Sequence, residues 1–122
     1  MTSPSKLQIT EDRQADIIVL TLSGQITLDD GDLVFGRHVD QLVAAGGRQI
    51  IVDLSEVTYI DSAGVGMLVA ESQRVAARGG SMRLAHLTAR SHHLFAMLKL
   101  KMMFEIYDDV DAAVRSFAWR PR

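Results

Sequence analysis

Asp61 and Ser62 place a carboxylate beside a hydroxyl, directly before residues that carry almost no side chains. Both stand at the predicted start of a helix, where either side chain can accept hydrogen bonds from the free N–H groups of the first turn. Ala63, Gly64 and Gly66 leave that turn bare, so a second molecule could approach its backbone closely. A serine N-cap followed by small residues also seats a helix against a sheet in many α/β proteins. Each interior glycine, however, costs a helix about 1 kcal/mol relative to alanine, and this cost favours a functional site.

A catalytic interpretation of this segment finds no support in the surrounding residues. A nucleophile elbow requires glycine two residues before the serine, where the chain has Ile60, and no histidine lies in the neighbouring segments to act as a base. Gly64 and Gly66 lack the third glycine of a dinucleotide-binding fingerprint, because Val69 stands in its place. No lysine follows to complete a phosphate-binding loop. The sequence therefore predicts neither a catalytic residue nor a bound cofactor.

The histidines and the clustered aspartates do not predict a metal site. His92 and His93 are adjacent, so on a helix their side chains point about 100° apart and cannot both bind one metal ion. Asp108, Asp109 and Asp111 lack the remaining ligands and the glycine turn of a calcium loop. Negative charge at a helix N-terminus accounts for these three aspartates.

Met97, Met102 and Met103 lie close together in a chain that has six methionines. Clustered methionines can form an adaptable binding surface, because their side chains are flexible and polarizable. Filling of the core beneath the last strand is the simpler interpretation, and it is the one that we predict.

The elements that must position Ser62 follow from alternating and helical patterns of apolar residues. Strands are predicted at residues 7–10, 17–22, 49–54, 81–85 and 104–107. Helices are predicted from the acidic cluster at 29–32 to Gly46, and at 62–78, 88–98 and 110–117. The order β-β-α-β-α-β-α-β-α predicts an α/β fold, with a mixed, mostly parallel sheet of about five strands covered by about four helices. Residues 55–61 are predicted as a short connection at the carboxyl end of the third strand, where functional loops of such sheets gather.

Composition limits the classes of protein to which the chain can belong. Its 122 residues suit one domain, which we place at 7–118, with a disordered tail at 1–6 and a short tail at 119–122. The absence of cysteine excludes disulfides and thiolate chemistry. A net charge of −2 disfavours binding to nucleic acid or to an anionic membrane. The longest uncharged apolar stretch, at 63–70, is too short to span a membrane, and the N-terminus does not resemble a secretory signal, so we expect a cytoplasmic protein.

The segment DLSxVxxIDSAGVGML at residues 53–68 resembles the signature of the STAS superfamily, specifically the bacterial anti-sigma-factor antagonists. The resemblance extends over nearly the whole chain, from the opening hairpin through Gly24 to the pattern that runs from Leu94 to Val114. It implies a small α/β domain that binds an anti-sigma factor with serine kinase activity. Ser62 matches the family's phosphate acceptor. In the family, the unmodified antagonist captures the anti-sigma factor, the phosphorylated form releases it, and a metal-dependent serine phosphatase resets the switch.

The resemblance also implies which residues contact the partner. In the turn around the serine these are Asp61, Ala63, Gly64, Val65 and Gly66. In the loop after the second strand, Thr27 stands where the family often has an aspartate that contacts the kinase, and Asp29 and Asp30 follow as nearby replacements. The glycine that is usual before the last strand is replaced near Lys101. Thr27 is the main support for an alternative, namely a STAS scaffold or sensor subunit, stressosome-like or ligand-binding, that phosphorylation of Ser62 does not switch.

Overall fold

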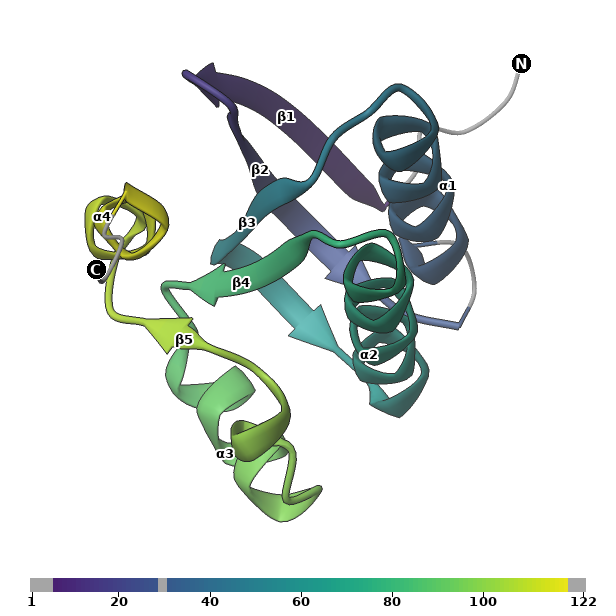
Figure 1. The fold of residues 1–122 in the computed structure, drawn as a ribbon. Coiled ribbons are helices and arrows are strands. Elements are labelled where there is room, and N and C mark those ends of the chain that lie inside the picture. Colours follow the sequence, from purple (N-terminus) through teal and green to yellow (C-terminus); the bar gives the residue numbers. More distant parts are fainter. Residues whose placement is uncertain (1–5, 29–30, 119–122) are drawn as a thin grey trace.

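The computed structural model describes residues 6–28 and 31–118 (Figure 1). The strands are β1 (Leu7–Gln14), β2 (Ile17–Ile26), β3 (Gln49–Ile60), β4 (Ser81–Ala85) and β5 (Ile106–Tyr107). The helices are α1 (Gly31–Ala44), α2 (Ser62–Ala77), α3 (Ala89–Met97) and α4 (Val110–Ala118), with a short 3₁₀ helix, η1 (Lys101–Met103). Residues 1–5 of the predicted N-terminal tail, the predicted tail at 119–122, and Asp29 and Asp30 lie outside the described residues.

The strands form one five-stranded sheet in the order β1-β2-β3-β4-β5. β1 pairs antiparallel with β2, and the other three pairs are parallel, each joined through a helix because parallel neighbours need a crossover connection. This arrangement confirms the predicted α/β fold with a mixed, mostly parallel sheet. The predicted strand at 104–107 is reduced to Ile106–Tyr107, because Phe104 is buried against Phe95 directly after η1 instead of extending the sheet.

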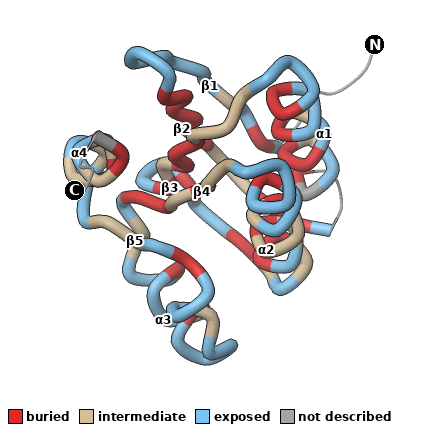
Figure 2. The backbone as a smooth tube through the Cα atoms, in the orientation of Figure 1, coloured by how far each residue is buried: buried red, intermediate tan, exposed pale blue. Residues whose placement is uncertain are grey.

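Helices cover both faces of the sheet, and β2 shows how the two faces are used. Ile18, Leu20 and Leu22 belong to the larger core, which α1 and α2 cover. Ile17 and Val19 belong to a smaller core beneath α4. This is the alternation expected of a strand, whose successive side chains point to opposite faces. Buried residues gather on the central strands and on the inner sides of α1 and α2 (Figure 2), while α3 lies at the β5 edge of the sheet (Figure 1).

β3 is longer than predicted, because the residues predicted as a connection at 55–61 continue the strand to Ile60. The pairing explains the difference. β4 pairs only with residues 49–53 of β3, so the second half of β3 pairs with β2 alone. Ser55, Glu56 and Tyr59 are exposed in this half. The polar residues that indicated a loop are therefore those of a strand segment that continues beyond β4 and has a neighbour, β2, on one side only.

β2 also continues past its predicted end at residue 22, and it reaches Ile26. Gly24 has a φ of +106°, and the register between β2 and β3 shifts at this point. A Cβ on Gly24 would lie 2.0 Å from the carbonyl oxygen of Lys6, so no larger residue fits here. The Gln25 N–H donates a hydrogen bond to that same carbonyl at 2.9 Å. The irregularity bends the strand without ending it, and it brings Ile26 beside the end of β3.

The buried side of α2 differs from the predicted one. The apolar pattern predicts an inward side made of Val65, Leu68, Val69, Ser72 and Ala76. The residues that are buried are Gly64, Val65, Leu68, Glu71 and Val75. The helix is rotated so that fully buried Glu71 stands where Ser72 was expected. A glutamate is rarely found at a buried position, which is why the pattern was misread.

Candidate functional site

Asp61 joins β3 to α2 and fixes the turn that carries Ser62. Its backbone is extended, and its side chain accepts a hydrogen bond from the Gly64 N–H at 2.8 Å, which makes Asp61 the N-cap of α2. The second carboxylate oxygen accepts a hydrogen bond from the Leu28 N–H at 3.2 Å. One carboxylate therefore ties the loop after β2 to the start of α2. Of the two residues predicted as N-cap candidates, Asp61 takes this role and Ser62 does not.

Ser62 is the first residue of α2, and it is exposed to solvent. Its neighbours differ, because Ala63 is half-buried and Val65 is buried in the core. The first N–H groups of a helix have no acceptor within the helix, and the helix dipole places partial positive charge beside them. The Ser62 hydroxyl therefore stands in solvent at a helix end that favours negative charge, next to the Asp61 carboxylate.

The two glycines of the turn are glycine for different reasons. A Cβ on Gly64 would lie 2.2 Å from the carbonyl oxygen of Ile26 and 2.9 Å from the Ile60 side chain, so α2 packs closely here against the ends of β2 and β3. A Cβ on Gly66 would meet nothing within 4 Å, and Gly66 is exposed. Packing thus explains Gly64. Gly66, rather than Gly64, keeps the surface beside Ser62 free of side-chain atoms.

Two exposed apolar side chains flank this turn, and the sequence-based reasoning missed both. Leu28 is 71% exposed and is held by the hydrogen bond from its N–H to Asp61, and Tyr59 is 42% exposed at the end of β3. The Arg90 guanidinium lies 5.6 Å from the centre of the Tyr59 ring, within the range of a cation–π contact. A leucine in an otherwise polar loop was the available signal for Leu28. Thr27 is buried, so its side chain does not meet a partner as an exposed aspartate would.

Glu71 lies more than two turns further along α2, where α2 packs against α1. Its Oε1 accepts a hydrogen bond from Arg74 at 2.7 Å, and its Oε2 is buried with no hydrogen-bond partner in the described part of the chain. Burial, and after it the nearby carboxylate of Asp40, raises the pKa of Glu71 to about 7, although Arg74 acts in the opposite direction. This carboxyl belongs to the packing between α1 and α2, and it does not form part of the turn at Ser62.

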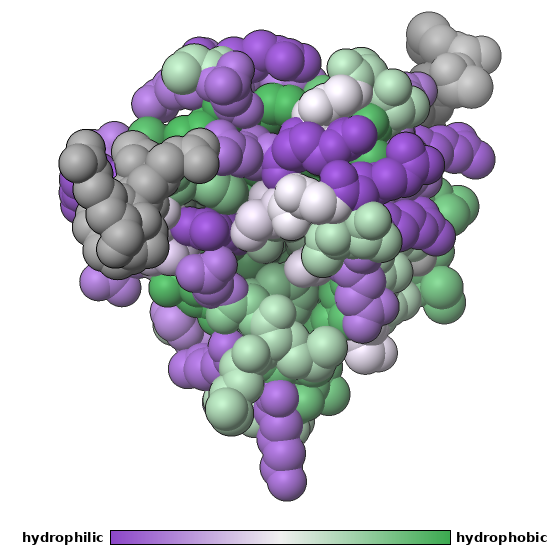
Figure 3. Space-filling model, in the orientation of Figure 1, coloured by the Kyte–Doolittle hydropathy of each residue, from purple (hydrophilic) through white to green (hydrophobic). Residues whose placement is uncertain are grey.

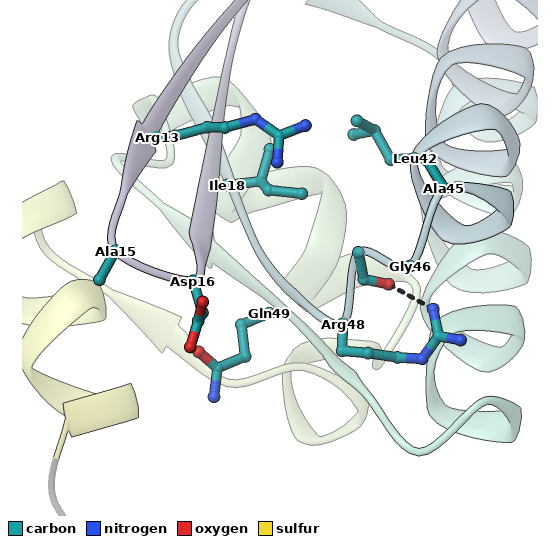
Figure 4. A pocket seen from close by; sticks show the side chains of 10 residues that line it. Arg13, Ala15, Asp16, Ile18, Leu42, Ala45, Gly46, Arg48 and Gln49 are labelled. Carbon is teal, nitrogen blue, oxygen red and sulfur yellow. Dashed lines mark hydrogen bonds between the residues drawn. The ribbon is translucent and has the colours of Figure 1, made fainter.

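A cavity of about 400 Å³ lies at the end of the sheet where β2 and β3 begin, which is the end opposite Ser62 (Figure 4). Its walls come from the β1–β2 turn, the end of α1 and the start of β3. Arg48 donates hydrogen bonds to the carbonyls of Gly47 and Val43 at 2.7 and 3.0 Å, which satisfies backbone oxygens at the end of α1. Arg13 pairs with Glu11 at 3.2 Å. Both arginines are thus engaged within the fold, and this cavity is separate from the Ser62 site.

The remaining candidates for chemistry stay apart in the structure. His92 and His93 are exposed on α3, and Asp109 accepts a hydrogen bond from the Ala112 N–H at 2.7 Å at the start of α4. Within residues 6–28 and 31–118, no group of histidine, aspartate and glutamate side chains is arranged to hold a metal ion. In the same part of the chain, no helix is both long enough and apolar enough to cross a membrane.

The sequence and the fold both match known proteins. A sequence model of the STAS domain matches residues 8–113, and the chain belongs to the STAS domain family. The anti-sigma-B factor antagonist of Bacillus subtilis is 34% identical to it over 89 residues, which make up 73% of this chain and 80% of that protein.

Solved structures of anti-sigma factor antagonists share this fold. One from Mycobacterium paratuberculosis superposes with a TM-score of 0.84 at 18% identity, over 98% of this chain and all of that one (100%). The Bacillus cell fate determinant SpoIIAA in its phosphorylated form superposes with a TM-score of 0.69 at 16% identity, over 91% of this chain and 98% of that one. The resemblance to anti-sigma-factor antagonists, predicted from the segment around Ser62, is confirmed.

Proposed function

We propose that the protein is an anti-sigma factor antagonist that binds its anti-sigma factor when Ser62 is unmodified and releases it when Ser62 is phosphorylated. The observation that carries the proposal is the exposed hydroxyl at the first position of α2, beside a carboxylate that is fixed as the N-cap. Ala63 follows, so Ser62 is the one hydroxyl residue at this end of the helix. The relative from Bacillus subtilis is an anti-sigma-B factor antagonist, which supports an anti-sigma factor as the partner.

The chemistry of a phosphoserine suits this position. A phosphoryl group adds a charge of about −1.5 to −2 at neutral pH. The free N–H groups at the N-terminus of α2 can donate hydrogen bonds to its oxygens, which stabilises the modified state. In a complex, the same charge beside Asp61 would have to lose its hydration, and the bulk of the phosphoryl group would separate the antagonist from its partner. Phosphorylation is therefore expected to favour the free antagonist over the complex.

The partner surface that we propose consists of Leu28, Tyr59, Ser62, Ala63 and Gly66. Leu28 and Tyr59 supply apolar area that a partner can cover, and Gly66 permits close approach to α2. The anti-sigma factor would itself act as the serine kinase, and a metal-dependent serine phosphatase would restore Ser62. This role requires no catalytic group on the antagonist, which acts as a binding module.

The modification is tested with the anti-sigma factor kinase of the same organism, ATP and mass spectrometry of the intact and digested protein. The wild-type chain should gain one phosphoryl group on Ser62, and Ser62→Ala should gain none. Ser55→Ala is the matched control, because Ser55 is also exposed but lies on β3. Phosphate on Ser55, or labelling that persists in Ser62→Ala, would contradict the assignment.

Binding is measured separately, with the immobilised anti-sigma factor. Ser62→Ala should bind within about twofold of the wild type, whereas Ser62→Glu should bind more than about tenfold more weakly, because it places a second carboxylate beside Asp61. Equal binding of both variants would mean that charge at this position does not control the complex. Thr27 favours the alternative of a scaffold or sensor subunit, because its buried side chain offers no carboxylate to a kinase. A scaffold would instead elute as large homomeric assemblies, and Ser62→Glu would leave them unchanged.

A further inference from the structure

The methionines at the end of α3 do not fill the core, and the prediction that they do is wrong. Met97 is 64% exposed, Met102 is 99% exposed and Met103 is 50% exposed. Together with exposed Leu98 and the two lysines between them, they form what we call the α3–η1 tip: Met97, Leu98, Lys99, Lys101, Met102 and Met103. Figure 3 shows hydrophobic residues gathered at the lower end of the molecule, over α3 and η1, with a hydrophilic side chain projecting from them.

Folding does not require these exposed apolar groups. Phe95 and Phe104 occupy the interior beneath the tip, with their ring centres 5.6 Å apart, and Leu100 packs against the same core. The Leu100 N–H donates a hydrogen bond to the Phe95 carbonyl at 2.9 Å, and the Met103 N–H donates one to the Leu100 carbonyl at 3.0 Å. The backbone of the tip is therefore held from below. Its four apolar side chains remain partly or wholly in water, and Met102, at 99% exposure, adds nothing to the stability of the isolated chain by burial.

Charge at the tip has a single sign. Lys99 and Lys101, the two charged residues of the tip, are both basic, in a chain with 13 basic and 15 acidic residues. Lys99 and Lys101 are exposed, and neither forms an ion pair within the part of the chain that the structure describes. Unpaired cations among exposed methionines are the complement of a surface that carries both carboxylates and apolar groups.

The tip is also hollowed. A cavity of about 320 Å³ is lined by Phe95, Ala96, Lys99, Lys101 and Met102. Phe95, Ala96 and Met102 supply apolar walls, and the two lysines complete the lining. A hollow of this kind suits a protruding apolar side chain whose acidic neighbours lie against the lysines.

We propose that the α3–η1 tip is a docking site for an acidic amphipathic segment of a protein partner, which inserts an apolar side chain beside Met102 and places carboxylates against Lys99 and Lys101. A membrane is a poorer occupant, since recognition of anionic lipid typically uses clusters of about 4–8 basic residues and the net charge of the chain is −2. The site is independent of Ser62. It lies at the end of α3 opposite Arg90, which contacts Tyr59 beside the Ser62 turn.

The test uses two synthetic peptides as probes, one helical with leucine and phenylalanine on one face and glutamate on the other, and a twin in which lysine replaces glutamate. Binding is followed through the methyl resonances of the protein labelled at methionine. Saturable shifts of Met97, Met102 and Met103 are expected with the acidic peptide, while Met82 in the core stays unchanged. The lysine twin should bind at least about tenfold more weakly.

Variants separate the contributions of charge and apolar contact. Lys99→Glu with Lys101→Glu should reverse the preference between the two peptides, whereas Arg115→Glu on α4 should not. Met102→Gln should weaken the acidic peptide about tenfold, as expected when one methionine no longer becomes buried. Ser62→Glu should leave the affinity unchanged, so that the outcome does not depend on the proposed function. The proposal is overturned if neither peptide shifts the tip methyls, if both bind equally, if only phosphatidylserine-containing vesicles bind, or if the tip methyls shift with protein concentration alone.

Discussion

Replacing Glu71 with glutamine is expected to remove most of the pH dependence of stability near neutrality. Burial, reinforced by Asp40, holds the pKa of Glu71 near 7 in the folded protein, against 4.5 for an ordinary glutamate. The folded protein therefore binds a proton more tightly than the unfolded chain does, and the free energy of unfolding falls as the pH rises through this window. Below an ordinary glutamate pKa, the carboxyl is protonated in both states and the full contribution is present.

The magnitude follows from the two pKa values. A difference between 4.5 and about 7 corresponds to about 3 kcal/mol, at about 1.4 kcal/mol for each pKa unit. Between about pH 5 and pH 8 the loss is about 2 kcal/mol, because titration is incomplete at both ends of that interval. Arg74 donates to the same carboxylate at 2.7 Å and lowers its pKa. Arg74→Gln is therefore expected to increase the loss.

The measurement is urea unfolding of the wild type and Glu71→Gln, followed by circular dichroism at several values across about pH 5 to 8. Glu56→Gln is the matched control, because Glu56 is exposed on β3. If glutamine destabilises the fold in general, the free energy of unfolding falls equally at every pH, and its slope with pH can still be measured. If Glu71→Gln unfolds with the same pH slope as the wild type, a buried carboxyl with a raised pKa is not the cause of that slope.

The turn at Ser62 and the end of α3 give further predictions, all measured by urea unfolding. Gly64→Ala should lower the free energy of unfolding by more than about 2 kcal/mol, because its methyl group would meet the Ile26 carbonyl. Gly66→Ala should raise it by about 0.5–1 kcal/mol, since space is open there. Equal effects of the two variants would contradict the packing argument. Asp61→Ala should cost about 1–2 kcal/mol, because it removes the N-cap of α2, and a neutral result would mean that water replaces the carboxylate. Lys99→Gly should add about 0.5–1 kcal/mol, because Lys99 has a φ of +56°, and a loss would show that its side chain supports the fold.

Much of the fold could be predicted because apolar periodicity records which face each element buries. Element order and sheet type both followed from it. The ends of β2 and β3 did not, because residues 55–60 of β3 lie beyond the end of β4, pair with β2 on one side only, and so keep polar residues at strand positions. Gly24 likewise concealed the end of β2, since a glycine that bends a strand looks in the sequence like one that ends it.

The site could be located from the sequence, although its construction could not. Two residues that can each cap a helix stood side by side, and the choice of Asp61 depends on the Leu28 N–H, which comes from a loop 33 residues earlier in the chain. Such contacts between distant segments leave no local pattern to read.

Gly64 and Gly66 separate what folding requires from what it does not. The Ile26 carbonyl excludes any side chain at Gly64, so this glycine would be kept in a protein with no partner at all. Among the described residues, nothing within 4 Å excludes one at Gly66, and Leu28 and Met102 are largely exposed. Residues of this second kind have no role in packing, and the contacts that we propose for the two surfaces account for them. Because they lie outside the core, substitutions at these positions are expected to leave the chain folded, which allows both proposed surfaces to be tested in folded protein.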